Sequence, residues 1–215
     1  MRQFIEQTIL NAVTPVAITS STDATPIVVT STSHGLSTGD RVYIQGHTTN
    51  IAANGIFKVT VLTANTFSLQ DEFTGADIAG TGAGAGSSGF CMKAPAVLLS
   101  SDFKTVVLTV ITAGTATMTP KIFSSDGKLS ADSASPRFDH PNMGATIGKT
   151  NPYVFIQSIN LDTGVAVDGA TGFIVAGTDI NKRFEVNSNG VKYLTIAPIT
   201  WTSGALTVKA TCYYF

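Results

Sequence analysis

Short runs of β-branched, aliphatic and aromatic residues, separated by turns that contain glycine or asparagine, recur along most of the chain. The clearest run covers residues 206–212, where apolar side chains alternate with Thr and Lys. A period of two places alternate side chains on opposite faces of a β-strand. The run therefore predicts a strand whose buried face is Leu206, Val208, Ala210 and Cys212.

Charge is scarce in this chain. Its 215 residues hold 13 Lys and Arg against 14 Asp and Glu, so that the formal net charge is −1. Charged residues make up 13% of the chain, about half of the usual share of roughly 25%. This balance disfavours a nucleic-acid binder, which needs a basic surface. A surface so poor in charge favours a protein that is covered by partners or by copies of itself.

Turn residues and low-complexity sequence divide the chain into four regions. Residues 74–89 are almost entirely Gly, Ala, Ser and Thr, and such a segment lacks the apolar area that would offset its chain entropy. We interpret it as a linker or long loop. The predicted regions are an N-terminal segment (1–26), a small β-barrel module (27–73), the Gly-rich linker (74–89) and an antiparallel β-sandwich (90–215).

The fold class predicted from these regions is all-β, a small barrel plus a sandwich. In the module we expect strands at 27–30, 41–45, 55–62 and 66–70. In the sandwich we expect them at 96–99, 105–111, 117–123, 153–159, 172–176, 183–186, 191–200 and 206–215. Residues 4–16 fit either a short helical turn or an edge strand, because apolar residues near helical spacing are followed by Pro15, which ends a helix before it.

Five residues carry the turn signals of the module: Gly35, Gly39, Asp40, Asn54 and Gly55. Asn-Gly is a strong hairpin signal, because both residues accept positive φ. Asp40 can cap the turn that precedes its strand. We expect the module core to consist of Leu36, Val42, Ile44, Phe57, Val59, Phe67 and Leu69.

The sequence holds little that indicates catalysis or metal binding. His34, His47 and His140 lack metal-ligand spacing. We interpret His34 as a turn histidine whose ring bonds the backbone, and His47 as a solvated loop residue. Asp139-His140 does not by itself indicate a triad, because a triad is set in space. Cys91 and Cys212 are interpreted as two buried thiols in preference to a disulfide.

Other candidate motifs are weak. Gly84 to Gly89 matches Gly-x-Gly-x-x-Gly, but a dinucleotide site needs a strand before this motif and a helix after it. The acidic residues Asp71, Glu72, Asp77 and Asp102 lack the spacing of a calcium loop. We therefore expect no catalytic residue, no metal site and no cofactor.

One stretch resembles a known module. The run Ser33-His-Gly-Leu-Ser-Thr-Gly-Asp-Arg-Val-Tyr-Ile44, followed by Asn54-Gly55-Ile-Phe and by Asn65-Thr-Phe67, resembles the small β-barrel named for the first catalytic-cysteine half-domain of ubiquitin-activating enzymes. The same pattern recurs in structural proteins of tailed bacteriophages. The resemblance implies a module and no ubiquitin chemistry, since no adenylation motif accompanies it.

A looser resemblance covers the rest of the chain. The segment 8–13, the paired runs 106–111 and 117–123, and the closing run from Trp201 look like small phage β-sandwich proteins such as capsid decoration proteins. This likeness suggests that residues 4–16 pair with the sandwich and that the barrel is an insertion. Simple tandem order is the alternative.

The sequence thus favours a structural, non-enzymatic virion protein of a tailed phage, as capsid decoration, cement or head fibre. The expected partners are copies of itself, with a trimer as the assumed state, and the major capsid protein or other virion proteins. We expect neither nucleic acid nor membrane as a partner, because no run approaches the roughly 20 apolar residues of a membrane span and the start lacks a signal-peptide pattern. The expected location is the virion, assembled in the host cytoplasm.

Two alternatives remain open at this stage. One is a tail or neck component. The other is a fibre-borne receptor- or carbohydrate-binding module, for which Trp201, Tyr193 and Tyr213 are the candidate platform residues.

Overall fold

The computed structural model describes residues 4–71, 74–82, 89–95, 98–99, 103–125, 154–155, 158–168, 171–187 and 193–213. All regular elements among them are strands apart from one 3-10 turn, η1 (Ile51–Ala53). The strands form two antiparallel sheets of nine and seven strands. The predicted all-β class is therefore confirmed.

The described residues fall into two compact units. One contains residues 4–14, 95–125 and 154–213, and the other contains 15–94. The larger unit holds the nine-stranded sheet, and the smaller unit holds the seven-stranded sheet.

The nine-stranded sheet is built on two strands of 21 residues, β10 (Thr105–Ser125) and β16 (Tyr193–Tyr213), which pair along their length. Its remaining strands are β1 (Phe4–Val13), β9 (Leu98–Leu99), β11 (Val154–Phe155), β12 (Ser158–Asn160), β13 (Ala166–Val167), β14 (Val175–Thr178) and β15 (Asn181–Asn187). The main path runs β1-β16-β10-β15-β12-β13, with β11 and β14 beside β10 and β9 beside β16.

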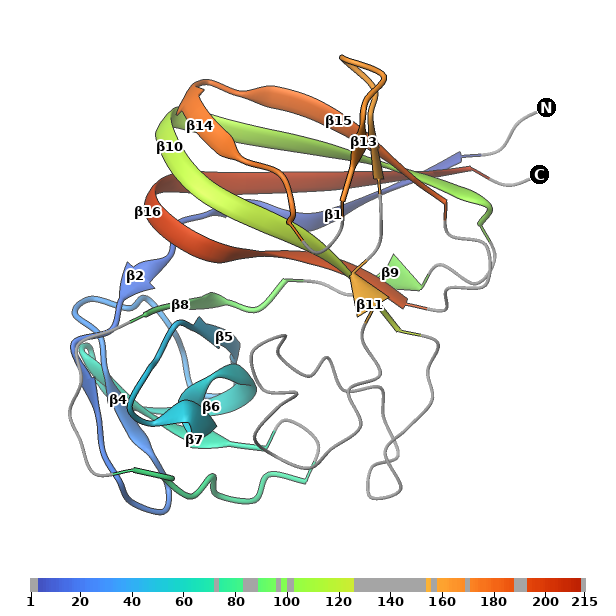
Figure 1. Cartoon of the computed structure of the whole chain (residues 1–215). Coiled ribbons are helices and arrows are strands. Elements are labelled where there is room, and N and C mark those ends of the chain that lie inside the picture. Colours follow the sequence, from blue (N-terminus) through green and yellow to red (C-terminus); the bar gives the residue numbers. More distant parts are fainter. Residues whose placement is uncertain are drawn as a thin grey trace. The chain divides into compact units, whose positions relative to one another are not determined.

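Both long strands bend back on themselves (Figure 1). The pairing register shifts between Ala113 and Met118, at the point where Gly114 and Gly204 have positive φ. A Cβ on Gly204 would lie 2.5 Å from the Cβ of Ala116, so the bend requires glycine there. The sequence predicted two separate strands in each of these stretches, because the small residues at the bend look like a loop. In the structure the ladder continues through bulges, which bend and twist a strand without ending it.

The bend gives this sheet two layers with an apolar interior. The first half of β10 pairs with β15, and its second half pairs with β14 and β11. Phe173, whose N–H donates to Pro120 in the second half of β10, stacks on Phe184 of β15 at 4.1 Å between ring centroids. The four alternating residues predicted for the last strand are all buried, which confirms that face.

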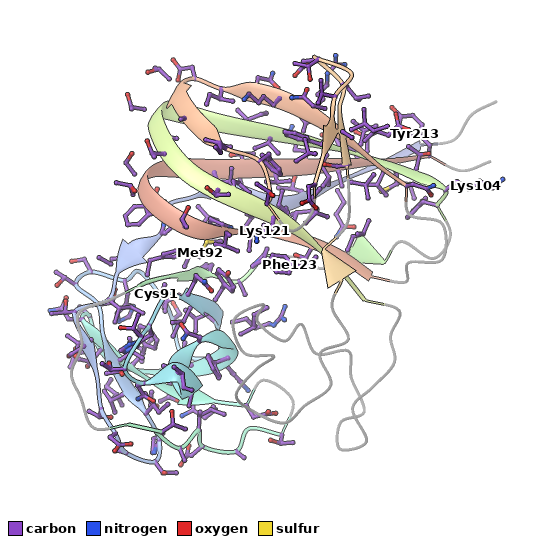
Figure 2. The ribbon with its side chains drawn as sticks, viewed as in Figure 1. Cys91, Met92, Lys104, Lys121, Phe123 and Tyr213 are labelled. Carbon is purple, nitrogen blue, oxygen red and sulfur yellow. The ribbon has the colours of Figure 1, made fainter. Side chains whose placement is uncertain are left out.

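The seven-stranded sheet has the order β2-β8-β5-β6-β7-β4-β3. Its strands are β2 (Val16–Ala17), β3 (Ser20–Ser21), β4 (Val28–Thr30), β5 (Arg41–Gln45), β6 (Gly55–Thr63), β7 (Thr66–Gln70) and β8 (Phe90–Lys93). Its core contains all seven residues expected from the sequence, together with Ile18, Ile27, Val29, Ala53 and Cys91. Figure 2 shows Cys91 on β8, among the side chains of this unit.

This sheet is strongly curved, as expected for the small, bent barrel that the sequence predicted, and the barrel is not closed. The two ends of its path, β2 and β3, are neighbours in the chain. Between them, Ile18 N–H donates to Gly89 on the β8 side, and Thr19 N–H donates to Thr30 on β4. Ile18 and Thr19 are thus neighbours in the chain but bond to opposite ends of the sheet. The chain itself connects these two ends, and no ladder of hydrogen bonds joins β2 to β3.

The structure also places two segments differently from the predicted regions. Strand β8 was assigned to the sandwich, but it pairs with β5 and β2 in the seven-stranded sheet. Residues 15–26 lie in the same unit. Strand β1 is a strand and not a helical turn, and it pairs with β16 from Phe4 to Val13. The smaller unit is therefore inserted between β1 and the rest of the larger one.

Candidate functional site

His34 is a structural histidine of the smaller unit. Leu36 N–H donates to its Nδ1 at 3.0 Å, and its Nε2 lies 3.1 Å from the carbonyl oxygen of Thr63. Since Nδ1 accepts, the ring proton is on Nε2, which donates to Thr63. The ring also meets Phe67 edge-on, at 5.0 Å between centroids. The predicted backbone bonding of His34 is confirmed.

His47 is not the solvated loop residue that the sequence predicted. Its side chain is only 2% exposed, and its Nε2 lies 2.6 Å from Ser21 Oγ on β3. Its Nδ1 is buried and has no partner among the described residues. Burial lowers the pKa of the imidazole, since the charged form is desolvated.

Two asparagines complete what we call the His47 cluster, which consists of Ser21, His47, Asn50 and Asn54. Asn50 Nδ2 donates to Ser21 Oγ at 3.2 Å and to the carbonyl of Thr22 at 2.9 Å. The Asn54 amide bonds both backbone groups of His47: it accepts from the N–H at 2.8 Å and donates to the carbonyl at 2.7 Å. All four side chains are buried. The cluster thus fastens the loop 46–54 to β3.

The Ser21–His47 pair has two parts of a nucleophile–base–acid arrangement, and the described residues do not supply the third. A triad needs a group that orients the second ring nitrogen, and Nδ1 lacks one among the described residues. Ser21 is itself 3% exposed. The sequence missed this pair, because 26 residues separate its members and only the curvature of the sheet brings them together.

The turn formed by Ser37 to Asp40 is built as expected. Gly35 and Gly39 have φ of 65° and 95°. Asp40 Oδ2 accepts from Ser37 N–H at 2.8 Å, while Asp40 N–H donates to the Ser37 carbonyl at 2.9 Å. The Ser37 N–H, together with Lys93 Nζ at 3.1 Å, holds the pKa of the Asp40 carboxyl below its usual value.

Asn54 and Gly55 do not form the two-residue hairpin turn that the sequence predicted. Asn54 has extended backbone (φ −82°, ψ 129°) and follows η1, and Gly55, with φ of 145°, begins β6. The hairpin signal is misleading because the Asn54 side chain bonds the His47 backbone instead of supporting a turn.

Residues 74–82 of the predicted linker lie against the smaller unit. Ile78 exchanges backbone bonds with Ile27 and Leu69, and Gly80 N–H donates to Ala24. Thr81 N–H donates to Asn50 Oδ1 at 3.2 Å. This part of the segment forms one isolated bridge, Gln70 with Asp77, and lies inside the unit of residues 15–94, so it does not link the two units. Residues 83–88, with most of the Gly-x-Gly-x-x-Gly match, lie outside the described residues.

The remaining candidates are dispersed. Cys91 and Cys212 are free and buried in different sheets, as predicted, and burial raises the pKa of each thiol to about 11.

The acidic candidates form no site in the described residues. Asp71 accepts from Thr74 in a turn. Glu72, Asp102 and His140 lie outside the described residues. Within the described ranges no three His, Cys, Asp or Glu side chains are grouped as for a metal ion.

The aromatic residues considered for a binding platform stand in three separate rows of the long ladder. Tyr193, Trp201 and Tyr213 pair with Ser125, Met118 and Thr105. Trp201 Nε1 donates to the Gly204 carbonyl at 3.0 Å, which ties the indole to the bend of β16. Ladder neighbours therefore do not assemble a platform from these three residues.

Exposed apolar side chains gather in a different place. Ile159, Leu161 and Val165 are 45%, 37% and 61% exposed on the hairpin formed by β12 and β13, which we call the apolar hairpin (residues 158–168). Ile174, just before β14, is also exposed. The hairpin is held to β15, where Leu161 N–H donates to the Arg183 carbonyl and Asp162 pairs with the Arg183 guanidinium at 3.6 Å.

Comparison with known proteins does not assign this chain to a family: no family model matches the sequence, and no curated protein matches it. In the part of the chain that the structure describes, no helix has the length and apolarity of a membrane span.

Proposed function

We propose that this chain is a structural, non-enzymatic component of a tailed-phage particle, a capsid decoration or head-fibre protein that assembles as a homotrimer. Its partners are copies of itself and the major capsid protein. It acts by burying β-sheet surface at repeated interfaces, which stabilises an assembly mainly through removal of apolar area from water.

The observation that carries this proposal is the apolar hairpin. Single exposed apolar residues are ordinary on a protein surface, whereas a cluster of them marks an interaction site. Three of the six large apolar side chains exposed among the described residues lie within this one hairpin. Asp162 of the hairpin pairs with the guanidinium of Arg183 on β15, which reduces the charge repulsion that a second copy meets there.

The edges of the nine-stranded sheet favour the same location. Its described path ends at β1 on one side and at β13 on the other. An edge strand presents unpaired backbone groups that can bind another strand. Strand β1 carries two register shifts against β16, and such bulges discourage edge pairing. Strand β13 is short, but it belongs to the apolar hairpin, so its side is the better candidate for contact between copies.

The outward face of β16 fits a weakly charged interface. Thr207 and Thr211 flank Lys209, whose ammonium pairs with Glu6 of β1 at 3.3 Å. Threonine hydroxyls donate and accept hydrogen bonds, so such a face can bond to another polar sheet without burying an unpaired charge.

The test is the mass of the purified protein in solution, measured by light scattering at tens of micromolar. We expect a trimer for the wild type and a shift towards monomer for Val165→Asp. Leu62→Asp is the matched control, since Leu62 is equally apolar and 53% exposed but lies on β6 of the other sheet. A monomeric wild type, or equal effects of both variants, would contradict the proposed interface.

A second measurement addresses the particle itself. Quantitative mass spectrometry of purified virions of the phage that encodes this chain should give hundreds of copies per particle for a decoration protein. Small multiples of three or six would assign it to the tail or neck instead. Absence of the chain from purified virions would reject the structural role.

A further inference from the structure

The proposed function gives no role to the buried side chain of His47. One ring nitrogen lies on Ser21 of β3, and the other has no partner among the described residues. Two residues earlier, Gln45 Oε1 is a second buried polar atom without a partner in the described part of the chain. Buried polar groups are nearly always paired, so an unpaired titratable nitrogen in the interior calls for an explanation.

Protonation would leave this site with more donors than acceptors. The imidazolium ring carries a proton on both nitrogens. If the neutral ring carries its proton on Nδ1, protonation makes Nε2 a donor to Ser21 Oγ, which already accepts from Asn50, and the Ser21 proton loses its acceptor on the ring. If the neutral ring carries its proton on Nε2, protonation adds an Nδ1–H that has no acceptor among the described residues. A buried charge would be added to these unpaired groups, and a buried charge without a partner is strongly unfavourable.

No ion pair among the described residues includes His47. The elements that meet at this end of the sheet carry the titratable residues Asp23, Arg41, Tyr43, Cys91 and Lys93. Burial raises the pKa of Tyr43 and Cys91, so both stay neutral, and Lys93 pairs with Asp40. Burial lowers the pKa of His47, which agrees with an imidazole that is held neutral.

We propose that His47 is an acid-sensitive switch, whose protonation releases the loop 46–54 from β3 while the β5–β6–β7 strands stay paired. The loop is the element that moves because its described bonds to β3 run through Ser21, which meets both the His47 ring and the Asn50 amide. Asn50 also bonds Thr22 and Thr81, and Ala52 N–H donates to Thr81. Gly82 packs against the same loop, since a Cβ there would lie 2.7 Å from the Thr49 carbonyl oxygen. The segment 80–82 would therefore be released together with the loop. This inference is independent of the proposed role in a particle.

The direction of the pH dependence follows from linkage. A histidine whose pKa is lower in the closed state binds its proton preferentially when the loop is open. The closed state keeps its full stability above the ordinary histidine pKa of about 6.5 and loses it progressively as the pH falls below that value. The opening equilibrium constant should rise by up to about thirtyfold between pH 7.5 and pH 5.

The test is backbone hydrogen exchange of the full chain at pH 7.5 and pH 5, corrected for the intrinsic pH dependence of exchange. We expect the amides of His47 and Thr81 to lose protection at pH 5, while those of Val59 and Phe67 keep it. His47→Gln should abolish this pH dependence. His34→Gln, which removes the other described buried histidine, should leave it in place.

The outcomes separate the alternatives. Loss of pH dependence in His34→Gln with its retention in His47→Gln would overturn the proposal, and so would a change of less than twofold in the wild type. If His47→Gln does not fold, the ring signals of His47 in the wild type decide the question by NMR. A ring that becomes charged above pH 5 while the Thr81 amide stays protected would also overturn it.

Discussion

The two sheets of this protein differ in where they place polar groups and how they treat their edges. The seven-stranded sheet buries a hydrogen-bonded cluster and joins its two edges through one stretch of chain, Val16–Ser21. The nine-stranded sheet has a largely apolar interior and ends in two separate edge strands. The smaller unit thus depends on specific polar hydrogen bonds, whereas the larger unit depends on apolar packing and keeps surface available for partners.

The substitution with the largest expected effect on stability tests whether the two units unfold separately. Phe67 is fully buried in the core of the seven-stranded sheet, and Phe67→Ala should cost about 3–5 kcal/mol. Hydrogen exchange should show the loss of protection in β4–β7, with β10 and β16 unchanged. Phe184→Ala is the matched variant in the other sheet and should give the reverse pattern. Equal loss across both sheets would mean that they unfold as one.

The substitution with the next largest expected effect tests whether the stability of the smaller unit depends on its buried polar hydrogen bonds. Asn54→Ala leaves the buried N–H and carbonyl of His47 without partners, and we expect a loss of roughly 2–4 kcal/mol for these two groups. Thr112 Oγ1 accepts from Ile180 N–H at the edge of the larger core, and Thr112→Val should cost less. Chemical denaturation of both variants measures the difference. A larger cost for Thr112→Val would reverse the comparison.

Backbone strain gives a smaller effect in the seven-stranded sheet. Gly55 has φ of 145° at the start of β6, so Gly55→Val forces a β-branched residue into an unfavourable conformation at a cost of about 1–3 kcal/mol. We expect exchange to increase within 15–94 while the nine-stranded sheet stays protected. Comparable loosening of β10 and β16 would show that strain passes between the units.

The smallest expected change in stability comes from Asp40, a charged residue of the seven-stranded sheet. The Asp40 carboxylate has a lowered pKa, so its contribution is present above the unfolded value of about 3.9 and is lost as the pH falls below it. Asp40→Asn should remove less than about 1 kcal/mol at pH 7 and should reduce the pH dependence of stability between pH 5 and pH 3. Thermal unfolding of the wild type and the variant across this range checks both points, and identical slopes would rule out the role of Asp40.

Local sequence patterns determined much of this protein. Alternation over 206–212 predicted the buried face of β16, because the period of two is a property of each strand alone. The apolar residues from Leu36 to Leu69 predicted the core of the smaller unit for the same reason. The turn at Asp40 was predictable because its bonds join residues three apart.

Strand pairing and burial depend on residues far apart in the chain, so only the tertiary structure decided them. Residues 113–117 look like a loop, yet β10 continues through them, because Thr115 and Ala116 pair with β14 while the pairing with β16 resumes at Thr117. Strand β8 follows the Gly-rich segment but pairs with β5, since a pairing partner cannot be read from a strand's own pattern. His47 has the sequence context of a solvated loop, and it is buried because the curvature of the seven-stranded sheet brings Ser21 to its ring. Burial and pairing are set by residues far apart in the chain, so they emerge only when the whole sheet has formed.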